Sequence, residues 1–182
     1  MTLEALARQG NTSTYENLAA RVSSRIHETR KAYLKECFSD FQSLGHRMES
    51  VATIHHMEFI NDSRSTTLNA TWYALESLHK PVVWITGGID RGNDYTMIAD
   101  LVRKKVRAII TLGPVHEKLT EAFGGLEIPI AGTAHMEEAV QAAYYFGKKG
   151  DAILLSPGCA SFDRFNNYEE RGHAFIRAVK NL

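Results

Sequence analysis

The chain has 182 residues, of which 44% are hydrophobic and 23% charged, and its 21 basic side chains balance its 21 acidic ones. These values are typical of a globular protein, and the zero net charge argues against nucleic acid or an anionic membrane as the main partner. The length fits one domain, or one domain with a fragment of another, whose core needs neither disulfides nor metal.

The cellular setting follows from what the sequence lacks. Two cysteines, Cys37 and Cys159, do not make a disulfide framework and fit a reducing compartment. The N-terminus has no basic-then-apolar signal pattern, and no apolar run approaches the roughly 20 residues that span a bilayer. We therefore expect a cytoplasmic protein that does not enter a membrane.

The first predicted elements are a helix and a hairpin. Residues 14–44 contain neither Gly nor Pro and carry apolar residues at helical spacing, which predicts a helix with little core of its own. Residues 48–54 and 57–60 predict two strands joined at His55-His56. The turn chemistry is weak, because neither histidine is of the Asn-Gly type that such turns favour.

From residue 68 onwards, helices and strands alternate. Helices are predicted at 68–78, from a cap at Asp94 to 105, from Pro114 to 123, from a cap at Thr133 to 146 and from a cap at Asn167 towards the end; strands are predicted at 81–86, 106–112, 126–130 and 151–155. Pro129 places the strand at 126–130 near a sheet edge. The order predicts a Rossmann-like three-layer α/β domain: a six-stranded, mostly parallel mixed sheet with helices on both faces, preceded by an N-terminal helical segment.

In such a sheet, ligands sit beyond the carboxyl ends of the strands, which selects the loops 61–67, 87–94, 113–114 and 156–168. The first offers Arg64, several hydroxyls and a helix N-terminus to an anion, although a plain capped helix start fits equally well.

The second and fourth loops combine small residues with arginines. Glycines at 87 and 88 permit close backbone approach, and Arg91 can bind a carboxylate or phosphate through two hydrogen bonds. The alternative for residues 87–94 is a tight strand-to-helix turn. Cys159 in the fourth loop is predicted to be a small buried thiol rather than a nucleophile. If the strand order brings these loops together, Arg64, Arg91 and Arg171 converge with hydroxyls on a small acidic ligand.

Familiar cofactor motifs are missing from these 182 residues. There is neither a Gly-x4-Gly-Lys-Ser/Thr phosphate loop nor a dinucleotide fingerprint. The eight histidines show no metal-ligand spacing, so we predict no metal site.

Five segments in this order resemble one family. They are His46-Arg47-Met48-Glu49, Phe59 to Thr66, Gly87 to Tyr95, Leu155 to Asp163, and Asn167 to Gly172. Together they resemble the C-terminal domain of the Mur ligases, most closely the UDP-N-acetylmuramoyl-L-alanine:D-glutamate ligases of peptidoglycan synthesis in cell wall biogenesis. The resemblance covers residues 46–182. More loosely, residues 1–45 resemble the end of the family's central domain.

The resemblance implies a reaction for the full-length enzymes. They use ATP and magnesium to phosphorylate a carboxylate, and the amine of D-glutamate then attacks the acyl phosphate to form an amide. The C-terminal domain holds D-glutamate. Because the ATP phosphate loop is absent from this chain, we expect no catalysis by the chain alone and no tight binding of ATP or magnesium. Its expected partners are D-glutamate or a similar small acidic ligand, and the remaining ligase domains.

The resemblance also implies site residues. Thr66 and Arg91 match positions that bind the α-carboxylate, and Arg64 matches a catalytic cation near the reacting groups. The positions around the side-chain carboxylate are Ser161, Phe162 and Tyr168. The positions on the nucleotide side are His46, Arg47, Asp62, Asn167 and Arg171.

Two departures from the family leave alternatives open. The family has lysine where Arg64 and Arg91 stand, and the two cations are not interchangeable at a tight site. One alternative is a standalone, non-catalytic paralogue that binds a small acidic metabolite or a partner domain. The other is a structural remnant that forms a homodimer through residues 14–44.

Overall fold

The computed structural model describes residues 21–22, 24–25, 28–29 and 45–182. The chain divides into two units, residues 1–40 and 41–182, and each is considered by itself. The described residues of the first unit are helical. The rest of the helix predicted over 14–44, and the dimer contact assigned to it, fall outside the described residues, and the domain boundary at residue 46 stays a prediction. No helix in the described ranges is long and apolar enough to cross a membrane.

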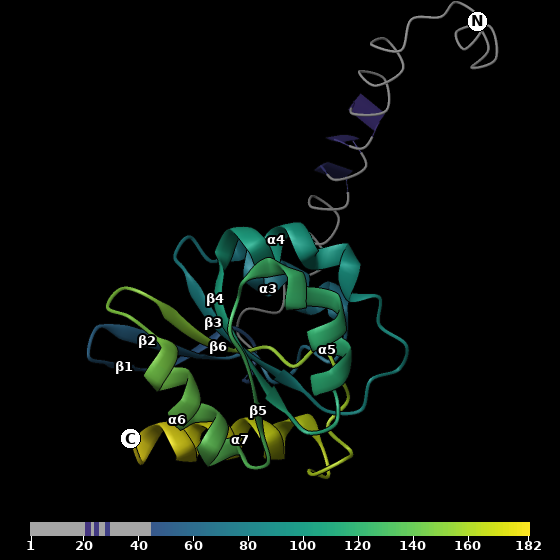
Figure 1. Ribbon diagram of the computed structural model, residues 1–182. Coiled ribbons are helices and arrows are strands. Elements are labelled where there is room, and N and C mark those ends of the chain that lie inside the picture. Colours follow the sequence, from purple (N-terminus) through teal and green to yellow (C-terminus); the bar gives the residue numbers. More distant parts are fainter. Residues whose placement is uncertain (1–20, 23, 26–27, 30–44) are drawn as a thin grey trace, which may run out of the picture. The chain divides into compact units, whose positions relative to one another are not determined.

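The second unit is built on a six-stranded sheet in the order β1-β2-β6-β3-β4-β5 (Figure 1). Its strands are β1 Glu49–Ile54, β2 Met57–Asn61, β3 Val82–Gly87, β4 Val106–Leu112, β5 Ile130–Thr133 and β6 Ala152–Leu155. Only β1 and β2 pair antiparallel within this sheet; the other neighbours are parallel. The predicted mixed sheet of six strands is confirmed.

Helices cover both faces of the sheet. They are α3 Leu68–Ser77, α4 Ala99–Lys105, α5 His116–Phe123, α6 Met136–Phe146 and α7 Tyr168–Lys180, with the short 3-10 helices η1 Tyr95–Ile98 and η2 Gly124–Leu126. Figure 1 shows α6 and α7 on one side of the sheet and α3, α4 and α5 on the other. This arrangement confirms the three-layer α/β domain.

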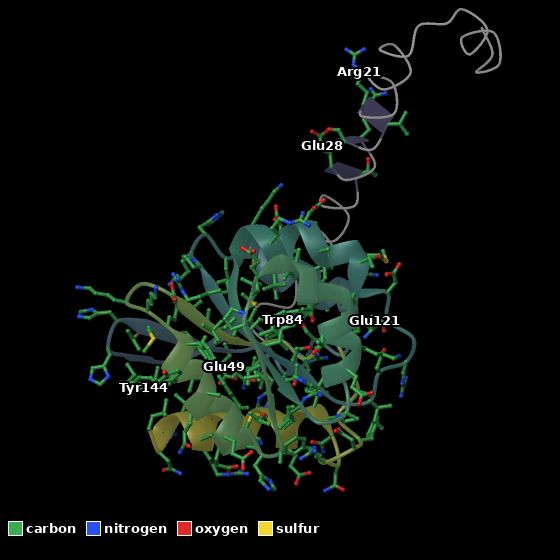
Figure 2. The ribbon with its side chains drawn as sticks, viewed as in Figure 1. Arg21, Glu28, Glu49, Trp84, Glu121 and Tyr144 are labelled. Carbon is green, nitrogen blue, oxygen red and sulfur yellow. The ribbon has the colours of Figure 1, made fainter. Side chains whose placement is uncertain are left out.

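The central strand β3 shows why the core forms here. All six of its residues are buried, as expected for a strand covered on both faces. Trp84, in the middle of the second unit in Figure 2, is completely buried against Phe123 of α5, with ring centroids 6.3 Å apart. Its indole N–H donates to the carbonyl of Ser156 at 2.7 Å, so its polar atom is satisfied as well.

The hairpin turn forms without the sequence that usually favours it. His55 and His56 have φ values of 47° and 64°, the positive φ at both central residues that a type I′ turn requires. His55 Nδ1 lies 2.6 Å from the Tyr144 hydroxyl of α6, so a contact outside the hairpin holds the turn.

Strand β5 begins four residues later than predicted. The chain after α5 continues as η2, and Glu127 then adopts a left-handed conformation with φ 54°. Pro129 therefore lies just before the strand, which suits a residue without an N–H. The predicted position at the sheet edge is confirmed, and the predicted bounds are wrong.

Three predicted helix starts also differ. Thr133 is the last residue of β5, and α6 is capped by His135, whose N–H donates to Glu138 at 3.3 Å. Asp94 caps η1 rather than α4. Pro114 precedes the first residue of α5 by two positions. Each true N-cap lies within a few residues of the predicted one, and two of the three are apolar: Ile98 for α4 and Val115 for α5 make no side-chain capping bond.

Lys105 closes the C-terminal end of α3 from outside that helix. Its ammonium donates to the carbonyls of Leu75, Glu76 and Leu78 at 3.1, 2.7 and 2.9 Å. A cation at this end satisfies free carbonyls and the helix dipole.

We expect Lys105→Met to lower the free energy of unfolding by about 1–2 kcal/mol, because three carbonyls lose a charged donor. Urea unfolding measures the change. Lys104→Met, at an exposed neighbouring position of α4, is the control and should change stability by less than about 0.5 kcal/mol. Equal effects of the two variants would show that Lys105 does not cap α3.

Candidate functional site

Three loops meet at the carboxyl edge of the sheet because their strands are neighbours. The order β2-β6-β3 places residues 62–67, 156–167 and 88–94 side by side. Direct bonds join them: Gly158 N donates to Ser65 O at 2.8 Å, and Ile89 N donates to Ala160 O at 2.8 Å. The predicted convergence of these three loops is confirmed.

The three loops and the start of α7 enclose a cavity of about 470 Å³. It is lined by Thr66, Thr67, Ile89, Arg91, Asn93, Gly158, Ala160, Ser161, Phe162, Asn167 and Tyr168. All five residues predicted to bind the amino acid are in this lining. Residues 113–114, the third of the four loops selected from the sequence, are not.

The lining has a chemistry that suits an anion. Arg91 supplies a guanidinium, Thr66, Thr67 and Ser161 supply hydroxyls, and the lining drawn from the described residues contains no Asp or Glu. Arginine is well suited to carboxylates because its planar fork makes two parallel hydrogen bonds. The pocket therefore favours a small ligand that carries negative charge.

The loop at 61–67 turns out to be both a helix start and part of the pocket. Thr67 is the N-cap of α3 and accepts a bond from Ala70 N at 3.3 Å, so the plain capping interpretation is correct for this residue. Thr66 lines the cavity. The Arg64 guanidinium lies over the ring of Tyr168, 5.4 Å from its centroid, and is not part of the described lining, so only Arg91 of the three predicted arginines lines the pocket.

Asp90 shapes the loop that carries Arg91. Its carboxylate accepts from Gly92 N at 3.0 Å and Asn93 N at 2.8 Å, and it pairs with Lys118 of α5 at 2.6 Å. Burial acts to raise the pKa of Asp90, but these bonds outweigh it and hold the pKa below its ordinary value. Residues 87–94 therefore form a tight turn and also contribute to the pocket lining.

The glycines of that loop serve the protein's own packing. A Cβ on Gly87 would collide with the carbonyl oxygen of Leu112, and one on Gly88 with the carbonyl oxygen of Ala160. Both residues also have φ values, 143° and 126°, that side chains rarely adopt. The close approach inferred from the sequence is therefore an approach to neighbouring backbone.

Cys159 is buried, and its Sγ lies 3.5 Å from the Tyr95 hydroxyl. Burial raises the pKa of the thiol, which keeps it protonated at neutral pH. The predicted small buried thiol is confirmed.

The five residues predicted for the nucleotide side are divided by the structure. Asn167 lines the pocket and caps α7 by accepting from Glu170 N at 2.7 Å. His46 and Arg47 lie on the segment before β1, where His46 Nδ1 accepts from Asn61 at 2.8 Å. Asp62 and Arg171 are each 1% exposed and point into the protein. Sequence reasoning could not foresee this burial, because an apolar pattern does not mark a buried charge.

The residues that sequence reasoning missed are neighbours of those it found. Ile89, Asn93, Gly158 and Ala160 line the cavity without having been singled out as ligand contacts. Their place in the selected loops was the available signal. Asn93 Nδ2 also donates to Gly158 O at 3.0 Å, so it helps to join two of the loops.

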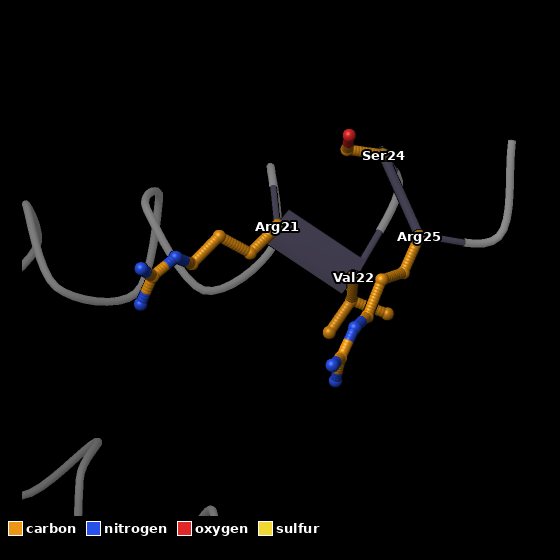
Figure 3. Close-up of a pocket in the computed structure, with 4 residues that line it drawn as sticks. All are labelled: Arg21, Val22, Ser24 and Arg25. Atoms are coloured by element: carbon orange, nitrogen blue, oxygen red, sulfur yellow. The ribbon is translucent and has the colours of Figure 1, made fainter. Parts of the chain in front are cut away.

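Among the described residues, a hollow in the first unit is lined by Arg21, Val22, Ser24 and Arg25. Figure 3 shows Arg25 pointing the same way as Val22, while Arg21 and Ser24 point in other directions. Elsewhere in the described ranges, no group of three His, Cys, Asp or Glu side chains is placed to hold a metal ion.

Comparison with known protein families identifies a family whose match includes two of the pocket loops. The family described as "Mur ligase, glutamate ligase domain" matches residues 46–159. The chain belongs to this family. That match confirms the resemblance inferred from the five sequence segments, and it contains the pocket loops after β2 and β3.

Relatives with high identity agree with this assignment. Residues along the whole chain are 47% identical to a UDP-N-acetylmuramoylalanine--D-glutamate ligase of Christiangramia forsetii and 46% identical to one of Bacteroides fragilis. In both cases the chain spans 41% of the relative's length. It thus corresponds to the C-terminal domain of such a Mur ligase.

Solved structures agree on the fold. A murein peptide ligase from Psychrobacter arcticus matches 78% of this chain with a TM-score of 0.53, using 31% of its own length. At 13% identity this likeness shows a shared fold alone.

Proposed function

We propose that the pocket binds D-glutamate, and that this Mur ligase domain presents it for amide bond formation in an ATP-dependent UDP-N-acetylmuramoylalanine--D-glutamate ligase. One observation carries the proposal. The five residues that the family resemblance predicts for the amino acid, drawn from three separate loops and α7, line one cavity without an acidic neighbour in its described lining. A chance grouping of these residues would leave some of them outside the pocket.

D-Glutamate matches the pocket's two kinds of polar group. Arg91 and Thr66 would hold the α-carboxylate, and Ser161 with the segment around Phe162 and Tyr168 would hold the side-chain carboxylate. Ile89 and Phe162 offer apolar surface to the methylene groups between them. Arg64, over the ring of Tyr168, would lie near the reacting groups.

ATP and magnesium enter this proposal only with the rest of a full-length ligase. The sequence holds no phosphate loop, and of the nucleotide-side residues only Asn167 reaches the pocket. When bound, ATP would supply the phosphoryl group that activates the acceptor carboxylate. We therefore expect amide formation only when the remaining ligase domains are present, in the cytoplasm where we place the protein.

We expect Arg91→Ala to weaken D-glutamate binding about tenfold or more, because a charge-assisted hydrogen bond contributes roughly 1.5–3 kcal/mol. Isothermal titration calorimetry of the 182-residue chain with D-glutamate, L-glutamate and ATP measures it. Arg103→Ala is the matched control: it removes an exposed arginine of α4 that pairs with Asp100. Wild-type affinity in Arg91→Ala would contradict the proposed α-carboxylate contact.

The same titrations decide between this function and the paralogue alternative. That alternative is favoured by arginine at positions 64 and 91 and by the stacking of the Arg64 guanidinium over the ring of Tyr168. It predicts equal binding of D-glutamate, L-glutamate and other small acids. Selective binding of the D-enantiomer supports the ligase domain. No binding of any of these acids contradicts the ligase domain and leaves only the form of the paralogue that binds a partner domain.

A further inference from the structure

Arg171 is a fully buried guanidinium that touches all three pocket loops. From one turn inside α7, its Nε donates to Ser63 Oγ at 3.1 Å and its Nη2 to Ser63 O at 2.9 Å. Its Nη1 donates to Gly87 O at 3.3 Å and Cys159 O at 3.0 Å. Ser63 and Cys159 belong to the loops after β2 and β6, and Gly87 is the last residue of β3, directly before the loop 88–94.

No carboxylate forms an ion pair with Arg171 in the part of the chain that the structure describes. Burial lowers the pKa of its guanidinium to about 10, which still leaves it charged at neutral pH. A buried charge is costly unless hydrogen bonds or an opposite charge compensate it. Here the carbonyls of Ser63, Gly87 and Cys159 and the Ser63 hydroxyl do so, and each lies in or next to a loop that contributes residues to the pocket.

The surrounding residues leave room for this side chain. A Cβ on Gly88 would lie 3.2 Å from Arg171 Nη1, closer than a relaxed contact allows. The Ser63 hydroxyl accepts a hydrogen bond from Arg171 Nε and donates one to the carbonyl of Tyr168 at 2.8 Å. Ser63 therefore links the start of α7 to the guanidinium. The guanidinium thus connects the chain segments at the ends of β2, β3 and β6 that surround the pocket.

We infer that Arg171 is a positioning residue for the amino-acid pocket: its fork holds the three loops in register, and its charge behind them favours an anionic ligand. This inference rests on the proposed function for its ligand. It replaces the nucleotide contact that the family resemblance suggests for this position with a role inside the protein.

The test compares Arg171→Lys, Arg171→Gln and Ser63→Ala in the 182-residue chain. Lysine keeps the charge but cannot reach three loops at once, glutamine removes the charge, and the Ser63 variant removes one acceptor. We expect D-glutamate affinity to fall about threefold in Ser63→Ala and Arg171→Lys, and at least tenfold in Arg171→Gln. If Arg171→Gln does not fold, the other two variants still decide.

Amide hydrogen exchange separates positioning from general damage, and it needs no ligand. The amides of Ile89 and Gly158, which bond across the loops, should exchange at least tenfold faster in Arg171→Lys. The amide of Ile109, in β4, should keep its wild-type protection. If the wild-type chain binds no D-glutamate, the proposed function is wrong. The exchange data then still test whether Arg171 positions the loops.

Two results would overturn the inference. One is wild-type exchange at Ile89 and Gly158 in a folded Arg171→Lys chain. The other is unchanged D-glutamate affinity in all three variants together with weaker binding of ATP, which would restore the nucleotide role.

Discussion

Gly88→Ala should destabilise the protein by about 3–5 kcal/mol. The added Cβ meets the carbonyl oxygen of Ala160 far inside van der Waals contact. The φ value of 126° is one that residues with a Cβ avoid. Backbone strain of this kind costs about 1–3 kcal/mol, and forcing an extra methyl group into a packed site costs a similar amount.

The effect should reach the pocket as well as the stability. To admit the methyl group, the bridge between Ile89 and Ala160 must open, and the Nη1 group of Arg171 lies directly behind it. We expect a melting temperature lower by about 10 °C, measured by calorimetry, and at least tenfold weaker D-glutamate binding in whatever fraction stays folded.

Gly92→Ala is the control for Gly88→Ala. Gly92 also has a positive φ, 89°, but a Cβ there would meet no atom within 4 Å. It should therefore cost only the backbone strain, about 1–2 kcal/mol. Equal losses in the two variants would show that the contact with Ala160 contributes nothing, and that conformation alone governs this loop.

The fold could be predicted from the sequence because its strands are short apolar runs between strong helix signals. Val106–Leu112 was predicted to the residue, since a charged helix end precedes it and a glycine follows it. Residues 126–130 show the limit of this reasoning. Their apolar residues suit a strand, but Leu126 ends η2 and Glu127 adopts a left-handed conformation. The edge strand therefore begins only at Ile130.

The pocket could be predicted because loop positions follow from strand order. Once β6 lies between β2 and β3, Thr66, Arg91 and Ser161 must lie at one edge. The two buried charges among the predicted site residues could not be predicted in the same way. Arg171 and Asp62 stand in polar stretches that suggest solvent or ligand contact, and only the packing of three loops against α7 decides that they face inward.

Asp62 is the other buried charge among the predicted site residues, and its environment makes stability depend on pH. Its carboxylate accepts from Met48 N at 3.2 Å and from Ser156 Oγ at 2.8 Å. Burial raises its pKa from the ordinary 3.8 to about 6, although these bonds and the nearby Arg47 act to lower it. Burial thus destabilises the charged carboxylate by more than its hydrogen bonds and Arg47 stabilise it.

The sign of the effect follows from proton uptake. Between pH 4 and pH 6 the folded protein binds more protons at Asp62 than the unfolded chain does, so stability falls as the pH rises through this window. The stability that the protonated group contributes is fully present below about pH 4 and lost above about pH 6. A shift of roughly two pKa units corresponds to a loss on the order of 3 kcal/mol.

Asp62→Asn should remove this pH dependence, because an amide does not titrate. Relative to the wild type, we expect the variant to gain on the order of 3 kcal/mol in free energy of unfolding between pH 4 and pH 7. Urea unfolding at closely spaced pH values measures this difference, in which the other carboxylates cancel. Asp100→Asn is the control: its side chain is 87% exposed, and its difference from the wild type should stay flat. A flat difference for Asp62→Asn would mean that the loop opens enough to hydrate the carboxylate, and that the pocket frame is looser than its hydrogen bonds indicate.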